Sequence, residues 1–290
     1  MLQTWIEGAR PKTLPAAIVP VVVGTAIAVG SEPSGFDSIL RFIAAMVVAL
    51  SLQVATNFVN DYADGERGTD DNRVGPKRLV ASGEVLASQV KKAAFVSFGV
   101  AGLAGLYLAA VVGWELIPLG AVCIAAGYAY TGGPRPYGYA GLGEVFVFIF
   151  FGLVATIGSY YVQTNSISWL SVLAGAAVGC WAVALLVTNN LRDIAGDTEA
   201  GKRTLATRIG DKNTRWSYVG LVVASVLFVL ACVASRPLAV LSLVGCILFV
   251  PAVRQIMVEK ATGTQLIGVL AQTGQAQLVA GILLGLGLAL

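Results

Sequence analysis

Two short stretches of the sequence place acidic and amide side chains at helical spacing. They hold Asn57, Asp61 and Asp64 in the first stretch and Asn189, Asp193 and Asp197 in the second. If each stretch is helical, its members lie on one face. Carboxylates in one stripe repel each other, and a hard divalent cation with oxygen ligands relieves that repulsion. We therefore expect the catalytic acids to be Asp61, Asp64, Asp193 and Asp197.

Basic side chains lie within or close behind each acidic stretch. Arg73, Lys77 and Arg78 follow the first, Lys202, Arg203 and Arg208 follow the second, and Arg192 lies inside the second. Acids for a metal ion beside bases for phosphate oxygens indicate a bound diphosphate. The expected diphosphate-binding residues are Lys77, Arg78, Arg192, Lys202 and Arg203. The alternative is that these residues only mark the basic cytoplasmic loops of a membrane protein.

A third stretch, 128–144, is rich in tyrosine, glycine and proline. It contains Tyr130, Arg135, Tyr139 and Glu144. Its aromatic faces and cation predict a wall for a second substrate, and aromatic rings also stabilise a passing carbocation. The alternative is an aromatic belt at the membrane interface. Because the sequence has no histidine, proton transfer near neutral pH must use a carboxylate, a tyrosine, water or the substrate.

Hydropathy predicts the elements that position these residues. Hydrophobic residues make up 57% of the 290-residue chain and charged residues only 12%, about half the charged share of a soluble domain. We expect an all-α, polytopic membrane protein whose single domain, 1–290, is one bundle of about nine transmembrane helices. The expected spans are 14–30, 39–60, 92–112, 114–131, 144–163, 169–190, 216–235, 237–257 and 265–290. The active-site loops are expected at about 61–92, 131–143 and 191–215.

The distribution of basic residues predicts the orientation in the membrane. With the N-terminus in the cytoplasm, all but two of the 19 basic residues fall in cytoplasmic loops, and the exceptions are Arg41 and Arg236. This asymmetry satisfies the positive-inside rule. Both acidic stretches then meet the same cytoplasmic surface, because the second and sixth spans run in the same direction. The expected location is the plasma membrane, with the active site facing the cytoplasm.

At these residues the chain resembles the UbiA superfamily of intramembrane aromatic prenyltransferases. The resemblance covers nearly the whole chain: nine spans, an N-D-x-x-D at the end of the second span and a D-x-x-x-D at the end of the sixth. It includes the Arg10-Pro-Lys-Thr-Leu start, Gly75-Pro76 and Tyr130-Thr-Gly-Gly-Pro134 with Leu142-Gly-Glu144. One departure is Gly68, which stands where many family members have a third aspartate.

The resemblance implies an Mg²⁺-dependent transfer of a polyprenyl group from an allylic polyprenyl diphosphate. Two Mg²⁺ ions are implied, with metal ligands Asn57, Asn60, Asp61, Asp64, Asn190, Asp193 and Asp197. The motifs look most like those of members that prenylate 1,4-dihydroxy-2-naphthoate for menaquinone, with loss of CO₂ and diphosphate to give demethylmenaquinol. The lipid bilayer is an expected partner, and nucleic acid is not.

The acceptor is expected to contact the loop 130–144 together with the N-terminal segment. The candidate acceptor-binding residues are Arg10, Lys12, Tyr130, Arg135, Tyr139 and Glu144. Arg135 would orient the carboxylate of the naphthoate, and Tyr139 would stack on the ring or hydrogen-bond to a hydroxyl. Glu144 would take up the proton released on attack.

Three alternatives remain open at this point. The same chemistry on another acceptor, such as 4-hydroxybenzoate, homogentisate, haem or a chlorophyllide, differs only in the acceptor loop. A cation-coupled transporter would place its carboxylates near the membrane midplane rather than at the cytoplasmic ends. A scaffold that binds lipid head groups through the basic loops leaves the paired acidic stripes unexplained.

Overall fold

The described part of the chain is helical throughout its regular structure. The computed structural model describes residues 2–69, 75 and 78–290. The α-helices are α1 Leu2–Ala9, α2 Pro15–Ile27, α3 Phe36–Glu66, α4 Ala87–Val111, α5 Leu116–Ala129, α6 Gly143–Val147, α7 Ala155–Thr164, α8 Trp169–Glu199, α9 Leu205–Val233, α10 Ser242–Cys246, α11 Val250–Met257 and α12 Gln265–Ala289. Short 3₁₀ turns are η1 Pro11–Thr13, η2 Tyr137–Ala140, η4 Pro237–Leu241 and η5 Ile247–Phe249, and η3 Phe148–Val154 is a π-helix.

Seven helical segments of the described chain are long and apolar enough to cross a membrane. Five of them are single helices and two are composite segments, and in chain order they are α3, α4, Gly143–Thr164, α8, α9, Pro237–Met257 and α12. The segment Gly143–Thr164 joins α6, η3 and α7, and Pro237–Met257 joins η4 to α11. The apolar helices α2 and α5 are shorter, at 13 and 14 residues. The expected all-helical membrane architecture is confirmed for the described residues.

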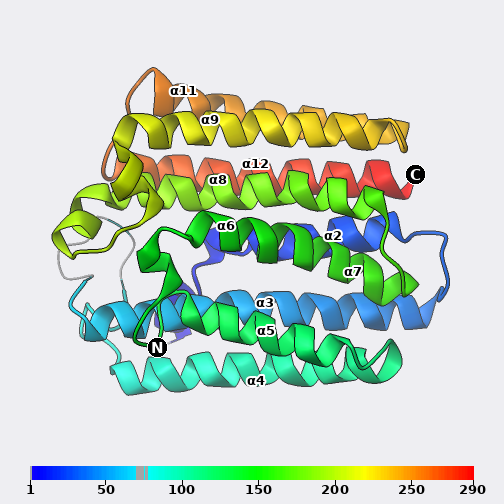
Figure 1. Cartoon of the computed structure of the whole chain (residues 1–290), viewed down its shortest axis with the longest axis horizontal. Coiled ribbons are helices and arrows are strands. Elements are labelled where there is room, and N and C mark those ends of the chain that lie inside the picture. Colours follow the sequence, from blue (N-terminus) through cyan, green and yellow to red (C-terminus); the bar gives the residue numbers. More distant parts are fainter. Residues whose placement is uncertain (1, 70–74, 76–77) are drawn as a thin grey trace.

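The long helices run alongside one another, and the ends that carry the acidic motifs meet at one end of the bundle. Figure 1 shows α3, α4 and α5 on one side and α8, α9, α11 and α12 on the other, with α2, α6 and α7 between them. The C-terminal ends of α3 and α8 both lie at the left end in that view, as does the N-terminus. The fold therefore brings two stretches far apart in sequence to one end of the molecule.

The helices extend further than hydropathy predicts. Helix α8 continues to Glu199 and α9 begins at Leu205, so the connection expected at 191–215 is confined to residues 200–204. The expected boundary is wrong because hydropathy detects the apolar span, whereas a helix continues beyond it until its ends are capped. Thr204 caps α9 by accepting a hydrogen bond from the Thr207 amide. Likewise α3 continues to Glu66, past both acids of the first motif.

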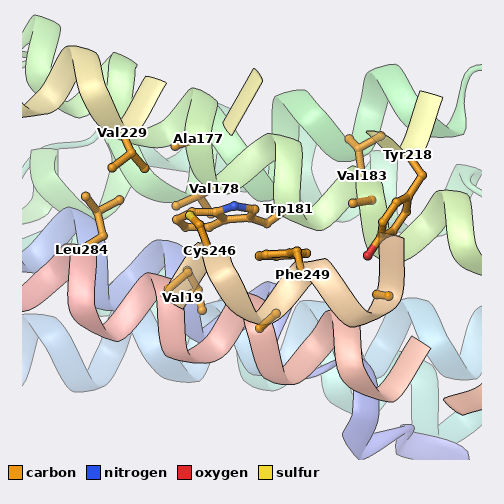
Figure 2. Close-up of a cluster of buried hydrophobic side chains, with 14 of the residues drawn as sticks. Val19, Ala177, Val178, Trp181, Val183, Tyr218, Val229, Cys246, Phe249 and Leu284 are labelled. Carbon is orange, nitrogen blue, oxygen red and sulfur yellow. The ribbon is translucent and has the colours of Figure 1, made fainter. Parts of the chain in front are cut away.

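A tightly packed core fixes α8 within the bundle. Trp181 of α8 is fully buried and stacks on Phe249, with ring centroids 6.5 Å apart and an interplanar angle of 18°. Figure 2 shows this pair among Val19, Val178 and Leu284. The span Gly143–Thr164 also approaches α8 closely.

That approach depends on glycines on both segments, among them Gly152 and Gly179. A Cβ added to Gly152 would lie 2.4 Å from the Cα of Gly179, so any side chain there would separate the two helices. Small residues at such crossings are typical of helix packing in membranes. The C-terminal end of α8, which carries the second motif, is thus held by a rigid scaffold.

Candidate active site

A cavity of about 790 Å³ runs between the helices from the motif end into the apolar interior. Its polar lining comes from both motifs and their neighbours: Arg10, Asn57, Asn60, Asp64, Arg78, Asn189, Asn190, Arg192, Asp193, Asp197 and Lys202. Toward the other end it is lined by side chains such as Leu52, Leu108, Ile124 and Val162. One cavity therefore offers a charged end and a long apolar end.

Asp64 is the centre of the polar end. Its Oδ2 accepts a hydrogen bond from Lys202 Nζ at 2.9 Å, and its Oδ1 accepts one from the Tyr139 hydroxyl at 2.5 Å. Lys202 also lies 3.9 Å from Asp197 Oδ1. The end of α3, the loop 130–142 and the connection after α8 thus meet at one buried carboxylate, which is 3% exposed.

Two cations lie close to the ring of Tyr139. The Lys202 ammonium lies 4.9 Å from the ring centroid and the Arg67 guanidinium 5.3 Å from it. Burial, followed by the charge of Asp64, raises the pKa of Tyr139 above its usual value. Burial would lower the pKa of Lys202, but Asp64, Tyr139 and Asp197 outweigh it, and the net pKa is raised. Tyr139 is therefore a phenol and Lys202 an ammonium at neutral pH.

Arg67 was not identified from the sequence. Its guanidinium donates hydrogen bonds to the carbonyls of Thr131 and Gly133 at 2.5 Å each. It therefore fastens the end of α3 to the loop that carries Tyr139. In the sequence, the only signal for this role is its position three residues after Asp64.

The second motif contains a buried ion pair. Arg192 donates to Asp193 through Nε and Nη2, each at 2.7 Å. A Cβ added to Gly75 would lie 3.3 Å from Cζ of Arg192. Gly75 therefore lies against the guanidinium of the second motif, and its lack of a side chain provides the space.

Asp61 does not line the cavity, although it was expected to share one face with Asn57 and Asp64. Its Oδ2 accepts a hydrogen bond from the Leu79 amide at 3.0 Å and its Oδ1 accepts one from the Val80 amide at 2.9 Å. The side chain is 1% exposed. Among the residues of the first motif, Asn57, Asn60 and Asp64 line the cavity. Asp61 lies at the edge of the helical face that carries Asn57 and Asp64. Its side chain therefore points toward the segment 79–80 and not into the cavity.

The cavity asparagines are held by hydrogen bonds to neighbouring protein groups. Asn57 Nδ2 donates to the Ala9 carbonyl at 2.9 Å and to Thr13 Oγ1 at 3.2 Å. Asn60 Oδ1 accepts from the Thr131 hydroxyl at 2.5 Å. Asn190 Nδ2 donates to Glu144 Oε1 at 2.8 Å. Each amide is therefore oriented before any substrate arrives.

An aromatic wall lies beside these amides. Tyr137 stacks on Phe146 with ring centroids 3.9 Å apart and an interplanar angle of 22°. Tyr130 lies 5.4 Å from Tyr137, and Phe150 lies 5.9 Å from Phe146. All four rings line the cavity.

Several residues expected at the site lie elsewhere. Lys12, Arg135 and Arg203 are exposed and do not line the cavity. Arg203 instead contacts the site through its backbone, because its amide donates to the Tyr139 carbonyl at 3.1 Å. Glu144 is buried behind Asn190 rather than in the cavity wall. Lys77 lies outside the described residues.

The oxygen donors at the polar end suit a magnesium ion that shares its ligands with a substrate. Within residues 2–69, 75 and 78–290, no group of three or more acidic, histidine or cysteine side chains forms a protein-only metal cage. Mg²⁺ is commonly held by one or two carboxylates together with phosphate oxygens and water. Asp64 and Asp197, both within 4 Å of one ammonium, show that a cation fits between the two motifs. The donor set therefore fits Mg²⁺ bound with a diphosphate.

Known proteins share both the sequence and the fold. A 1,4-dihydroxy-2-naphthoate octaprenyltransferase of Mycobacterium tuberculosis is 43% identical over 275 residues, which cover 95% of this chain and 93% of the relative. The Escherichia coli protein of the same name is 39% identical over 230 residues, covering 77% of this chain and 74% of the relative.

Solved structures give the same result for the fold. A UbiA homolog from Aeropyrum pernix K1 superposes with a TM-score of 0.72 at 17% identity, covering 96% of this chain and 97% of the homolog. A UbiA homolog from Archaeoglobus fulgidus, bound to GPP and Mg²⁺, superposes with a TM-score of 0.66 at 13% identity, covering 96% and 99%. The model of the UbiA prenyltransferase family matches residues 17–265. The chain therefore belongs to the UbiA prenyltransferase family and is a multi-pass membrane protein.

Proposed function

We propose that the protein transfers a polyprenyl group from a polyprenyl diphosphate to 1,4-dihydroxy-2-naphthoate, releasing diphosphate and CO₂ and forming demethylmenaquinol. The observation that carries the proposal is the single cavity that joins an acidic and basic end, an aromatic wall and an apolar channel. These three parts suit a diphosphate, a flat aromatic acceptor and an isoprenoid tail. The relatives from M. tuberculosis and E. coli carry the name of this activity.

The diphosphate is proposed to bind between the two motifs. Asp64, Asp193 and Asp197, with Asn60, would hold two Mg²⁺ ions, which would neutralise the diphosphate oxygens and assist their departure. Lys202 already lies between Asp64 and Asp197, so a small rotation brings its ammonium to a phosphate oxygen. Arg78 and Arg192 line the same end of the cavity and supply further positive charge.

The acceptor is proposed to bind against the aromatic wall. The allylic C–O bond breaks as diphosphate leaves, and the ring carbon that bears the carboxylate forms the new C–C bond. The bond to the carboxylate then breaks, and its electron pair restores the aromatic ring as CO₂ departs. Because CO₂ rather than a proton leaves the attacked carbon, the reaction does not need Glu144 as a base. The rings of Tyr130, Tyr137 and Phe146 would exclude water and stabilise the allylic cation.

The membrane arrangement is part of the proposal. The seven long segments together with α2 and α5 make nine spans in one domain, 1–290, with the N-terminus in the cytoplasm and the site at the cytoplasmic face of the plasma membrane. Almost all basic residues then lie on the cytoplasmic side. A single cysteine at position 205 should react with an impermeant thiol reagent only in inside-out vesicles, and one at position 34 only in intact cells. Reaction of both from the same side would contradict this orientation.

The direct test uses the purified protein in lipid nanodiscs. Carboxyl-labelled 1,4-dihydroxy-2-naphthoate, a polyprenyl diphosphate and Mg²⁺ should yield labelled CO₂ and a prenylated lipid in equal amounts. The paired variant Asp64→Asn with Asp197→Asn is the negative control. Parallel reactions with 4-hydroxybenzoate and homogentisate test the acceptor. Turnover of either of these in preference to the dihydroxynaphthoate would overturn the proposed substrate.

A further inference from the structure

We infer that Asn57 and Asn190 present their amide carbonyl oxygens to the two hydroxyls of a para-dihydroxylated aromatic acceptor, with Glu144 fixing the orientation of Asn190. This inference rests on the proposed function and gives its acceptor site a specific recognition element. It assigns Asn57 and Asn190 to the acceptor rather than to the metal ions, and it assigns Glu144 a positioning role rather than a catalytic one.

The orientation of Asn57 follows from its partners. Both acceptors of its Nδ2 belong to the N-terminal segment, namely the Ala9 carbonyl and Thr13 Oγ1. A backbone carbonyl only accepts hydrogen bonds, so the amide cannot be reversed without losing that contact. Arg10 secures the arrangement by donating to the Asn57 carbonyl of the main chain at 3.2 Å. Because Asn57 lines the cavity, its Oδ1 is the amide atom left to meet a ligand.

Asn190 is oriented from the opposite wall. Its Nδ2 donates to Glu144 Oε1 at 2.8 Å, and a carboxylate accepts hydrogen bonds without donating them. Glu144 is 9% exposed, and its Oε2 has no hydrogen-bond partner among the described residues. A buried carboxylate is costly, and here its visible interaction is with one amide. The result is that Asn190 turns Oδ1 away from Glu144 and toward the cavity that it lines.

The two asparagines occupy equivalent positions on the two motif helices. Asn57 precedes Asp64 by seven residues, and Asn190 precedes Asp197 by seven residues. Seven residues of helix rise about 10.5 Å, so both oxygens lie about two turns deeper than the last acid of each motif. With an Mg²⁺–oxygen bond of roughly 2 Å, neither asparagine is expected to share an ion with Asp64 or Asp197. Asn60 and Asp193 lie only three residues from Asn57 and Asn190, so Mn²⁺ binding is measured in the asparagine variants as well.

The amide oxygens of Asn57 and Asn190 favour a ligand that carries hydroxyl groups. A neutral amide oxygen accepts a hydrogen bond from a hydroxyl but forms no hydrogen bond with an apolar tail. Two such oxygens, from α3 and α8 in one cavity, would suit a ring with a hydroxyl at each of two opposite positions. The adjacent wall of Tyr130, Tyr137 and Phe146 supplies the flat surface for that ring. An acceptor with one hydroxyl leaves one buried oxygen without a partner, which disfavours it by roughly 5- to 150-fold.

The test compares ligand binding by wild-type and variant proteins and does not depend on turnover. Dissociation constants are measured by equilibrium binding for 1,4-dihydroxy-2-naphthoate, and for 1-hydroxy-2-naphthoate and 4-hydroxy-2-naphthoate, each of which lacks one hydroxyl. In Asn57→Ala and Asn190→Ala, the dihydroxy compound should bind roughly 5- to 150-fold more weakly. Each variant should bind one analogue almost as well as the wild type does, namely the analogue that lacks the hydroxyl which that asparagine receives.

Glu144→Gln tests the positioning role with a smaller change in shape. Glutamine donates as well as accepts, so Asn190 is free to reverse, and the variant should reproduce most of the Asn190→Ala pattern. The KM for the prenyl diphosphate and the affinity for Mn²⁺ with pyrophosphate should not change. Asn213→Ala, an exposed asparagine on α9 that bonds the Ile209 carbonyl, is the matched control and should match the wild type.

Two outcomes would overturn the inference while leaving the proposed function intact. One is equal weakening of both analogues by each asparagine variant, which would indicate a general loss of structure. The other is a fall in Mn²⁺ affinity with unchanged analogue binding, which would return the asparagines to the metal site. Failure of the wild-type protein to prenylate dihydroxynaphthoate would instead refute the proposed function.

Discussion

Replacing Asp61 by alanine should weaken the structure around the site more than it weakens metal binding. The carboxylate accepts hydrogen bonds from the backbone amides of Leu79 and Val80, and Leu79 is 1% exposed. Asp61→Ala strands both donors in a buried position. Each stranded donor costs about 1–3 kcal/mol, so the variant should lose about 2–6 kcal/mol.

The assay compares Asp61→Ala with Asp64→Asn in the same detergent. Thermal unfolding followed by tryptophan fluorescence should show a lowered midpoint for Asp61→Ala and a smaller change for Asp64→Asn. Mn²⁺ binding in the presence of pyrophosphate should show the opposite order, because Asp64 lines the cavity and Asp61 does not. Asp37→Asn, an exposed acid at the start of α3, controls for the loss of one negative charge.

A specific result would refute this reasoning. If Asp61→Ala unfolded at the wild-type temperature and lost Mn²⁺ binding as completely as Asp64→Asn, Asp61 would be a metal ligand. Its bonds to the two amides would then be incidental to its role. Reduced turnover alone would decide nothing, since a displaced segment 78–80 also lowers activity.

Three further outcomes are expected. Activity should disappear in EDTA and return with Mg²⁺, as measured by CO₂ release, because without a bound cation the carboxylates at the cavity end would repel the diphosphate. Lys202→Gln should raise the KM for the prenyl diphosphate, whereas Arg203→Gln, which changes an exposed side chain, should leave that KM nearly unaltered. Gly152→Ala should lower thermal stability by about 1–3 kcal/mol through overpacking, while Gly99→Ala, where an added Cβ meets nothing within 4 Å, should leave it unchanged.

Local patterns predicted the helices and most of the polar end of the cavity. Apolar runs placed the long segments correctly, and helical spacing brought Asp64, Asp193 and Asp197 to one cavity. Apolar runs and helical spacing depend only on residues close together in the chain, so both can be read from the sequence. The distribution of charge also predicted that both motif ends meet, as the contact of Lys202 with Asp64 and Asp197 requires.

The features that the sequence did not predict depend on contacts between segments that are far apart in the chain. Spacing alone placed Asp61 beside Asp64, but the position of the segment 79–80 decides which way Asp61 faces. Arg67 gained its role only because the loop carrying Thr131 and Tyr139 lies against α3. Arg135 shows the reverse case, since a suitable residue type in a suitable loop points to solvent. Side-chain direction in loops is set by tertiary packing, which no local pattern encodes.

The π-helix η3 makes the acceptor side of the cavity sensitive to chain length. A π-helix contains one residue more than the α-helix it interrupts, and removing one residue from Phe148–Val154 would turn α6 by about 100° relative to α7. Helix α7 is fixed against α2, where a Cβ on Gly24 would lie 2.2 Å from the Thr156 carbonyl, so α6 would rotate. Glu144 would swing away from Asn190, and Phe146 would leave the aromatic wall. A single codon deleted far from either acidic motif would therefore reshape the pocket for the ring while sparing the site for the diphosphate.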